Sequence, residues 1–493
     1  MHAMDKNLDP EACYRALQAR DPRFDGVFYV GVLTTGIYCR PICSAGPPKF
    51  ENCTFLPSAA AAHQRGFRPC LRCRPELSPG IAGWRGTATT VSRALYLIAD
   101  GALTDAGVDV LADQLGVTAR HLRRLFQRHL GATPISVAQT HRILFAKKLL
   151  SESSLTMTEI AMAAGFGSIR RFNSAMQQVF GMPPSQLRRR ADPEPNGTTG
   201  IKLKLPFSLP YDWQTMIEFL ALRAIPGVET VQSGRYLRTF AIEGACGTVA
   251  VEPGSDNYLL ATIWTSHVAA LGGIIGRLRR LFDLDADMTA IDTHLMADPA
   301  LAVRVLNRPG VRVPGAWDEF ELAVRAVLGQ QISVRAATTL AGRLTELAGS
   351  SLEPGMRATE ADLHRLFPTP AELAEADLTK TGIVASRAQT LRHLAQAMLG
   401  EPRLLRPFES LDATVGKLVS IPGVGTWTAQ YIAMRALREP DAFPASDLGL
   451  LRALEDCYGR PTPAQVLSRA EAWRPWRAYG AIRLWAQPAI DYR

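Results

Sequence analysis

The sequence predicts a multidomain, mainly α-helical protein. A chain of 493 residues is too long for one hydrophobic core and suggests three or four domains. Helical periodicity runs through residues 87–190 and again from residue 284 to the C-terminus, whereas strand-like alternation is confined to residues 201–283. Residues 1–80 instead carry two close pairs of cysteines among prolines and glycines, which favours a small domain folded around a metal.

Composition and charge narrow the class of protein. With 47% hydrophobic and 20% charged residues, the chain has the composition of a folded soluble protein. No apolar run reaches the length of a membrane span and the N-terminus has no signal-peptide core, so we expect a cytoplasmic protein with no membrane partner. The net charge of +9 lies wholly in residues 1–200, which hold 24 Lys and Arg against 15 Asp and Glu. Attraction to a polyanion is therefore expected mainly from that part of the chain.

The cysteines come in two pairs. Cys39 and Cys43 are separated by three residues, and Cys70 and Cys73 by two. Four thiolates so spaced suit tetrahedral zinc, and a reducing compartment argues against disulfides. By spacing alone, a purely structural zinc site is the more common case. The surrounding segments ARDPRFDGVFYVGVLTTGIYCRPIC and GFRPCLRCRPE resemble the N-terminal domain of the Ada adaptive-response family.

That resemblance implies one Zn²⁺ held by the four cysteines, with Cys39 acting also as the acceptor of a methyl group from a DNA methylphosphotriester. Zinc would keep the thiolate deprotonated at neutral pH, and the methyl carbon of a phosphotriester is a soft electrophile. The transfer is irreversible, so the acceptor would be stoichiometric. Methylation would also make the cluster less negative, and we expect it to tighten DNA binding. An inactive sensor with structural zinc is the alternative.

Residues 87–190 contain two successive units of helix, glycine turn and helix. In the first, 108–131, Gly116 makes the turn and Thr118 caps the second helix; in the second, 156–189, the second helix begins near Ser168. Arginines follow both starts: Arg120, Arg123, Arg124, Arg170 and Arg171.

The tandem resembles the AraC-type DNA-binding domain, including its AxxxGFxSxxxFxxxFxxxxGxxPxxxR signature. The resemblance implies two recognition helices in the major grooves of promoter DNA, with RNA polymerase as a further partner. The alternative is that these arginines form only a solvated face. Residues 191–200, polar and rich in proline and glycine, predict a linker.

The rest of the chain predicts two further domains. Alternating segments such as YLRTFAIE and NYLLATIWTS indicate a small α/β domain over residues 201–283. Residues 284–493 predict an all-α domain, and its longest amphipathic pattern covers residues 320–347.

The segment IPGVGTWTAQ, residues 421–430, predicts a helix, a tight turn at Gly423 and Gly425, and a second helix. Backbone N–H groups at the start of a helix attract anions, and glycine lets a ligand approach closely. A lone Gly-x-Gly would only end one helix and start another. Here Trp427 and Tyr431 lie one helical turn apart, and Asp447 follows downstream.

Together with five further segments, this hairpin resembles the AlkA-type 3-methyladenine glycosylases of the helix-hairpin-helix superfamily. The segments are residues 210–231, 280–287, 308–334, 367–377 and 472–485, so the resemblance covers about residues 201–493. It implies that double-stranded alkylated DNA is the substrate. Asp447 would be the catalytic carboxylate, with Trp427, Tyr431 and Trp485 forming the base pocket.

By the same resemblance Gly423, Gly425 and Thr426 would contact the DNA backbone. Whether a monovalent cation binds at the hairpin is left undecided by the sequence. Asp447 is also a reasonable helix N-cap, and both roles can hold together. Trp485, taken alone, is more typical of a core residue.

One loop departs from the family pattern. The loop that wedges into the duplex in this family carries Gln and then an aliphatic residue, whereas here the pair is Gln330 and Gln331. Gln331 would then fill the gap left by the extruded base through hydrogen bonds.

Two absences shape the predicted chemistry. Members of the Ada family that this chain resembles usually end in a methylguanine methyltransferase domain with a Pro-Cys-His-Arg motif. No such string occurs here, and neither Cys246 nor Cys457 precedes a histidine, so we expect no methyl transfer from O6-methylguanine. No lysine stands at or near the far side of the hairpin as a Schiff-base candidate, so we expect a monofunctional N-glycosylase without lyase activity.

The sequence therefore predicts alkylation repair joined to its own regulation. A zinc–cysteine methylphosphotriester sensor and an AraC-type transcriptional activator would precede a glycosylase that hydrolyses alkylated bases from DNA. The competing hypothesis is a transcription regulator whose glycosylase-like half only binds DNA.

Overall fold

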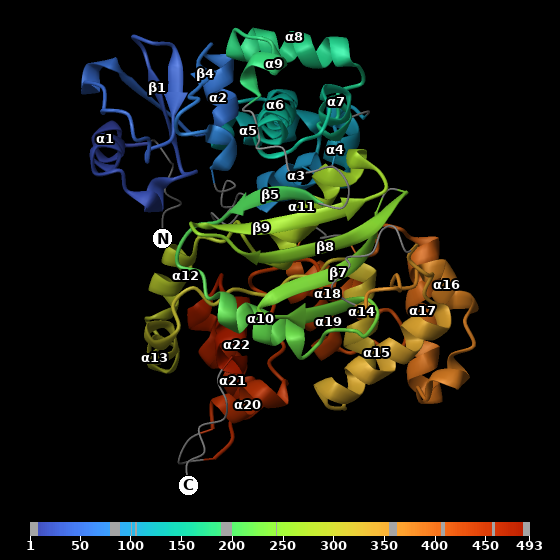
Figure 1. The fold of residues 1–493 in the computed structure, drawn as a ribbon. Helices are drawn as coiled ribbons and strands as arrows, with labels where there is room; N and C mark the ends of the chain where they lie inside the picture. The colour runs from blue at the N-terminus through green and yellow to red at the C-terminus, as the bar shows by residue number, and fades with distance from the viewer. Residues whose placement is uncertain are drawn as a thin grey trace.

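The computed structural model describes residues 8–78, 89–99, 101–103, 106–188, 200–242, 244–353, 362–405, 410–455 and 459–486. Figure 1 shows a small N-terminal sheet beside a layer of helices, a larger sheet beneath that layer, and a helical part beyond the larger sheet. Nearly all of the predicted linker, and Cys457, lie outside the described residues. No helix in the described ranges is long and apolar enough to cross a membrane.

A four-stranded sheet is formed by the described N-terminal residues, in the order β3-β1-β2-β4. Strand β1 is antiparallel to β2 and β3, whereas β2 and β4 are parallel. Because parallel strands end at the same edge, this pairing brings the residues after β2 and β4 together. The elements here are α1 (Pro10–Ala19), η1 (Pro22–Phe24), β1 (Tyr29–Val32), β2 (Ile37–Cys39), η2 (Phe50–Asn52), β3 (Cys53–Leu56), α2 (Ala59–Gln64), β4 (Arg68–Pro69) and η3 (Pro75–Leu77).

The two predicted helix-turn-helix units are present. Thr118 accepts a hydrogen bond from the His121 N–H and caps α5, and Ser168 accepts from the Arg171 N–H and caps α8, as the sequence indicated. The long helix α6 lies between the two units. The helices of this part are α3 (Thr89–Ala99), α4 (Val108–Gln114), α5 (Ala119–Leu130), α6 (Pro134–Glu152), α7 (Met157–Ala163), α8 (Ile169–Phe180) and α9 (Pro184–Leu187).

The predicted strands after residue 200 form an antiparallel sheet, which has five strands in the described residues, in the order β5-β9-β8-β7-β6. The strands are β5 (Ile201–Pro206), β6 (Glu229–Gln232), β7 (Arg235–Ile242), β8 (Ala245–Pro253) and β9 (Tyr258–Thr265), with helices α10 (Trp213–Ala221), η5 (Val268–Ala270) and α11 (Leu271–Leu281).

Beyond residue 284 the described chain is helical apart from isolated bridges, as predicted. The elements are α12 (Met288–Leu295), α13 (Pro299–Asn307), α14 (Glu319–Leu328), α15 (Val334–Ala348), α16 (Pro370–Glu375), η7 (Leu378–Thr381), α17 (Ala385–Gly400), α18 (Leu411–Val419), α19 (Thr426–Arg435), α20 (Leu448–Ala453), α21 (Pro463–Ala470), η8 (Glu471–Trp473) and α22 (Arg477–Trp485). The long amphipathic pattern over 320–347 is split into α14 and α15, because Gln331 adopts φ 56° and Ser333 caps a new helix.

The N-terminal half, residues 8–188, packs directly onto the larger sheet. One hydrophobic core contains residues from both halves, among them Leu149 of α6, Phe172 of α8, Leu203 of β5 and Ile274 of α11. Helix α6 contacts β5, α7 contacts η5, and α3 contacts α11. Figure 1 shows the same arrangement, with α3 lying beside α11. The two halves therefore share buried apolar surface, which a connection through a linker alone would not provide.

Candidate functional site

The hairpin between α18 and α19 is built as the glycines required. Gly423 has φ 89°, and a Cβ at this position would lie 1.9 Å from the Thr390 Oγ1 atom of α17. Gly425 is the N-cap of α19 and provides no side-chain hydrogen bond to the helix. Gly423, Gly425 and Thr426 are all exposed. The start of α19 therefore presents backbone N–H groups at an open surface, which is an arrangement suited to an anion.

The Asp447 carboxylate joins three helices. Its Oδ1 atom accepts from the Leu450 N–H at 3.1 Å, which makes it the N-cap of α20. The Trp485 Nε1 atom of α22 donates to the same oxygen at 2.9 Å, and the Trp427 Nε1 atom of α19 donates to Oδ2 at 2.9 Å. Asp447 is thus confirmed as the N-cap of α20, and its carboxylate also lines an open cleft.

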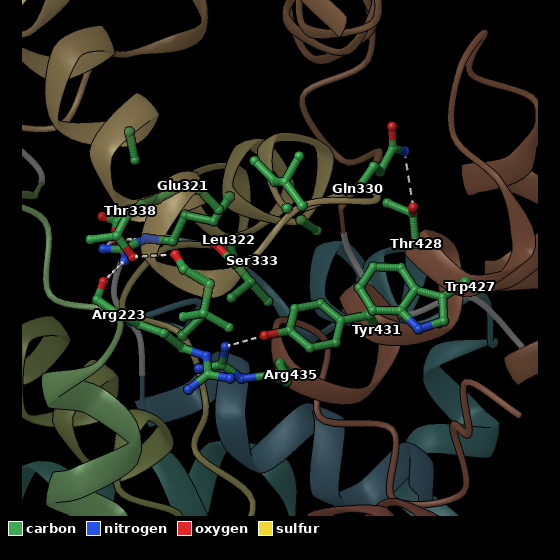
Figure 2. A pocket seen from close by; sticks show the side chains of 18 of the residues that line it. Arg223, Glu321, Leu322, Gln330, Ser333, Thr338, Trp427, Thr428, Tyr431 and Arg435 are labelled. Atoms are coloured by element: carbon green, nitrogen blue, oxygen red, sulfur yellow. Dashed lines mark hydrogen bonds and ion pairs between the residues drawn. The ribbon is translucent and has the colours of Figure 1, made fainter. Parts of the chain in front are cut away.

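The three predicted aromatic residues lie together in that cleft. The Trp427 and Tyr431 rings are stacked, with centroids 5.2 Å apart and planes at 10°. The Tyr431 and Trp485 centroids lie 6.1 Å apart. Figure 2 shows Tyr431 next to Trp427 with its hydroxyl toward Arg435. Neighbouring π faces beside a carboxylate form a surface that attracts a planar cation.

Arg435 was not anticipated from the sequence. It follows Tyr431 by one helical turn, and its Nη1 atom donates to the Tyr431 hydroxyl at 2.7 Å. Burial would raise the pKa of Tyr431, but the guanidinium groups of Arg435 and Arg223 outweigh burial and lower that pKa. The far edge of the aromatic pocket is therefore positively charged.

The cleft has a volume of about 1460 Å³ and runs between the hairpin and the wall formed by α14, α15 and β7. That wall contains a buried ion network. Glu321 accepts from Arg238 at 2.8 Å and from Arg325 at 2.6 Å, and Arg325 also pairs with Glu229. Burial raises the pKa of Glu321, but the two arginines outweigh it and lower the value to about 2. A signal was present in the sequence, because Glu321 and Arg325 stand four residues apart in a helix that is apolar from Leu322 to Leu328 except for Arg325.

The two glutamines of the α14–α15 turn have different environments. The Gln330 side chain reaches the hairpin, where its Nε2 atom donates to the Gly423 carbonyl at 3.1 Å and to the Thr428 hydroxyl at 3.0 Å (Figure 2). The Arg387 guanidinium donates to the Gln330 carbonyl at 2.6 Å. Gln331 is exposed at the tip of the turn and lines the cleft. Both glutamines line the cleft, but the Gln330 amide is bonded to the hairpin, whereas Gln331 is the more exposed of the two.

The four predicted zinc ligands form one cluster. The Sγ atoms of Cys39, Cys43, Cys70 and Cys73 all lie within 4.8 Å of one another. Tetrahedral zinc with Zn–S bonds of about 2.3 Å requires sulfurs about 3.8 Å apart, so the set fits one Zn²⁺. The Arg40 N–H donates to the Cys73 Sγ at 3.3 Å, a contact of the kind that supports a metal-bound thiolate.

An open groove of about 530 Å³ reaches this cluster. Cys39, Cys43 and Cys70 line it, and so do the exposed side chains of Arg68 and Arg72. A thiolate that can be reached from solvent, with two guanidinium groups beside the opening, is accessible to a substrate carried on a phosphate backbone.

Helices α5 and α8 expose the arginines that the sequence singled out. Arg120, Arg123 and Arg124 are exposed on α5, and Arg170 and Arg171 are exposed on α8. The opposite faces are fully buried and include Leu122 and Phe126 on α5 and Phe172 on α8.

The hairpin geometry yields a prediction about its two glycines. Gly423→Ala should destabilise the fold by at least about 1 kcal/mol, because alanine is strained at positive φ and its Cβ meets Thr390. Gly425→Ala is the matched control, since its φ is −87° and nothing lies within 4 Å of its Cβ position. Thermal unfolding of both variants would measure the difference. Equal melting temperatures would contradict this account of the turn.

Four family models match the chain. The metal binding domain of Ada matches residues 12–76, and a helix-turn-helix domain matches residues 111–190. The AlkA N-terminal domain matches residues 202–318, and the HhH-GPD superfamily base excision DNA repair protein matches residues 324–478.

Curated relatives cover both halves. The "Probable bifunctional transcriptional activator/DNA repair enzyme AlkA" of Mycobacterium tuberculosis is 42% identical over 482 residues, which are 97% of this chain and 96% of the relative. DNA-3-methyladenine glycosylase 2 of Escherichia coli is 34% identical over 56% of this chain and 94% of its own. The Escherichia coli enzyme Ada is 33% identical over 37% of this chain and 49% of its own.

The fold of the second half is also found among solved structures. A 3-methyladenine DNA-glycosylase from Archaeoglobus fulgidus matches 58% of this chain and 96% of its own with a TM-score of 0.50 and 21% identity, which shows a shared fold. The Mycobacterium relative matches nearly the whole chain, and the four family models match its successive parts. The chain therefore belongs to the family of bifunctional AlkA enzymes, in which an Ada-type zinc domain and a helix-turn-helix transcriptional activator are joined to a base excision DNA glycosylase.

Proposed function

We propose that this protein releases alkylated bases of the 3-methyladenine type from double-stranded DNA by hydrolysis, with Asp447 as the catalytic carboxylate. The observation that carries the proposal is the position of that carboxylate, which lines the same cleft as Trp427, Tyr431 and Trp485. The similarity to DNA-3-methyladenine glycosylase 2 of Escherichia coli supports this choice of substrate.

The chemistry follows from the leaving group. A base alkylated on a ring nitrogen is already cationic, so the N-glycosidic bond breaks with its electron pair going to the base, which leaves without protonation. The sugar becomes an oxocarbenium-like cation at C1′, and water adds there and loses a proton. Asp447 stabilises the positive sugar and orients the water, while the aromatic faces hold the extruded cationic base.

The two tryptophans have a second role. The indole N–H groups of Trp427 and Trp485 each donate to one Asp447 oxygen and so fix the carboxylate plane. A carboxylate offers about four acceptor positions. With the Leu450 N–H, three of them are taken, which leaves one on Oδ2 for a water molecule. Preorganisation of this kind lowers the cost of reaching the reactive geometry.

Asp447→Asn should reduce release of 3-methyladenine from methylated duplex DNA by at least about 100-fold, because the charge is lost while an asparagine can still cap α20. Asp298→Asn is the matched control: Asp298 also caps a helix and accepts an indole N–H, from Trp473 at 2.9 Å. Chromatography of released bases in single-turnover reactions measures both.

Three outcomes separate the hypotheses. Loss of release in the Asp447 variant alone supports the proposal. No release by the unmodified chain would favour the alternative, a regulator whose glycosylase half only binds DNA. Equal release by the unmodified chain and the Asp447 variant would mean that another group supplies the charge.

We propose that the hairpin residues Gly423, Gly425 and Thr426 bind the DNA backbone and that Gln331 enters the space vacated by the extruded base. The exposure of Gln331 beside the cleft supports this role. So do the hydrogen bonds that hold the Gln330 amide on the hairpin, because they leave Gln331 as the glutamine without such a contact to the hairpin.

Gln331→Ala should weaken binding to duplex DNA that contains an abasic-site analogue by about 10-fold, since roughly 1 to 1.5 kcal/mol of hydrogen bonding would be lost. Affinity for undamaged duplex should change little. Fluorescence anisotropy would measure both affinities, with Gln389→Ala, an exposed glutamine of α17, as control. Unchanged affinity for the abasic duplex would exclude Gln331 as the wedge.

We further propose that Cys39 accepts a methyl group from a DNA methylphosphotriester. Zinc bound to the four cysteines would supply a stable thiolate. The Cys39 sulfur attacks the methyl carbon, an S–CH₃ bond forms as the O–CH₃ bond breaks, and the phosphate regains its negative charge. The groove that reaches Cys39, with Arg68 and Arg72 beside it, supports this reaction. The arginines of α5 and α8 would then read promoter DNA, and the activator would act with RNA polymerase.

Incubation of the full chain with methylphosphotriester DNA should add one methyl group per molecule, located on the Cys39 peptide by mass spectrometry. Cys53→Ser, which changes a cysteine outside the cluster, should be methylated normally. A methyl group on any other cysteine, or none, would contradict the assignment.

A further inference from the structure

The segment that carries Asp447 is held in part by the N-terminal, regulatory half of the chain, residues 8–188. Residues 436–447 connect α19 to α20 and include Glu439. The Nη2 atom of Arg93, on α3, donates to the Glu439 Oε1 atom at 2.5 Å. The two side chains are only 18% and 9% exposed. A well-shielded ion pair thus joins residues that are 346 positions apart in the sequence.

Glu439 stands where the segment leaves α19. Its N–H donates to the Ala433 carbonyl at 2.9 Å, and its carbonyl accepts from the Ala442 N–H at 3.1 Å. The preceding residue, Arg438, adopts φ 56° and pairs with Asp283 at 2.7 Å. The positive φ of Arg438 turns the backbone away from the axis of α19, and the two backbone hydrogen bonds of Glu439 fix where the segment starts.

The segment is then fixed stepwise as far as the catalytic carboxylate. The Phe443 N–H donates to the Gln430 Oε1 atom at 2.9 Å, and the Asp447 N–H donates to the Pro444 carbonyl at 2.9 Å. A short series of hydrogen-bonded turns thus lies between Glu439 and Asp447, and a displacement at Glu439 would pass along it. Small displacements of a catalytic group reduce rates strongly, even when substrate binding is preserved.

We propose that Arg93 is a positioning residue for base excision, acting through Glu439 on the segment that carries Asp447. The inference rests on the proposed role of Asp447. Removing the guanidinium leaves Glu439 shielded from solvent without this partner, and a shielded carboxylate in that state tends to move toward water. The regulatory half would thereby contribute to the geometry of the glycosylase active site, through a contact beyond the shared core.

Helix α3 offers a matched control. Tyr96 lies about one turn after Arg93 and packs under the Arg280 guanidinium of α11, 4.1 Å from its ring centroid. Tyr96→Leu removes this second contact between the halves and leaves the Arg93–Glu439 pair in place. Any general effect of loosening α3 should therefore occur in both variants.

The experiment compares the full chain with Arg93→Met, Arg93→Lys, Glu439→Gln and Tyr96→Leu in single-turnover release of 3-methyladenine. Arg93→Met and Glu439→Gln should each lower the rate constant about 10- to 100-fold. A double variant that carries both substitutions should lower it no further, because both remove the same ion pair. Arg93→Lys should recover part of the rate, because an ammonium group can still pair with Glu439. Affinity for abasic-analogue duplex should stay within about threefold of the unmodified chain, as expected when ground-state binding is unaffected.

Hydrogen exchange provides a readout independent of activity. The amides of Phe443 and Asp447 should exchange faster in Arg93→Met than in Tyr96→Leu, since only the former variant releases the segment. This measurement also shows whether a slow variant is still folded elsewhere.

The outcomes separate the two proposals. If the unmodified chain releases the base and Arg93→Met releases it at the same rate, the positioning role is wrong while the proposed function stands. Equal losses in Arg93→Met and Tyr96→Leu, with weaker DNA binding in both, would also overturn it. No release by the unmodified chain would overturn both proposals.

Discussion

The carboxylate of Asp447 is the point on which the second half of the molecule depends. Its two oxygens accept N–H groups from α19, α20 and α22, so one side chain fixes the mutual position of three helices. The hairpin belongs to α19, and the aromatic pocket is shared between α19 and α22. Because these bonds converge on one group, the hairpin, the aromatic pocket and the carboxylate are held in fixed positions relative to one another. A scaffold of this kind suits a reaction that depends on orientation and charge.

Much of the local structure could be predicted from sequence. The cysteine spacing gave the metal cluster, and Thr118 and Ser168 marked the starts of two helices because a hydroxyl there satisfies an otherwise unpaired N–H group. The glycines at 423 and 425 marked the hairpin. These signals are local, since each depends on residues within a few positions of one another.

Long-range polar contacts were beyond such reasoning. Gln330 was predicted as one of the pair in the wedge loop, and its hydrogen bond to the hairpin carbonyl, 93 positions away, had no signal in the sequence. Of the two arginines that pair with Glu321, Arg325 stands one turn along the same helix, but Arg238 lies on β7, 83 positions away, and nothing in a periodic pattern identifies it. The pairing of Arg93 with Glu439 is of the same type. Side-chain partners across domains are set by how surfaces dock, which periodicity does not encode.

The common core of the two halves limits how the protein can be divided into fragments for study. Leu203, Leu149 and Ile274 are each fully buried in a cluster to which both halves contribute. Cutting the chain between the two halves would leave each fragment with a bare aliphatic face. Fragments with such faces self-associate in water. To keep either fragment in solution without detergent, the apolar residues exposed by the cut would have to be replaced by polar ones. In the intact chain each half covers the apolar surface of the other.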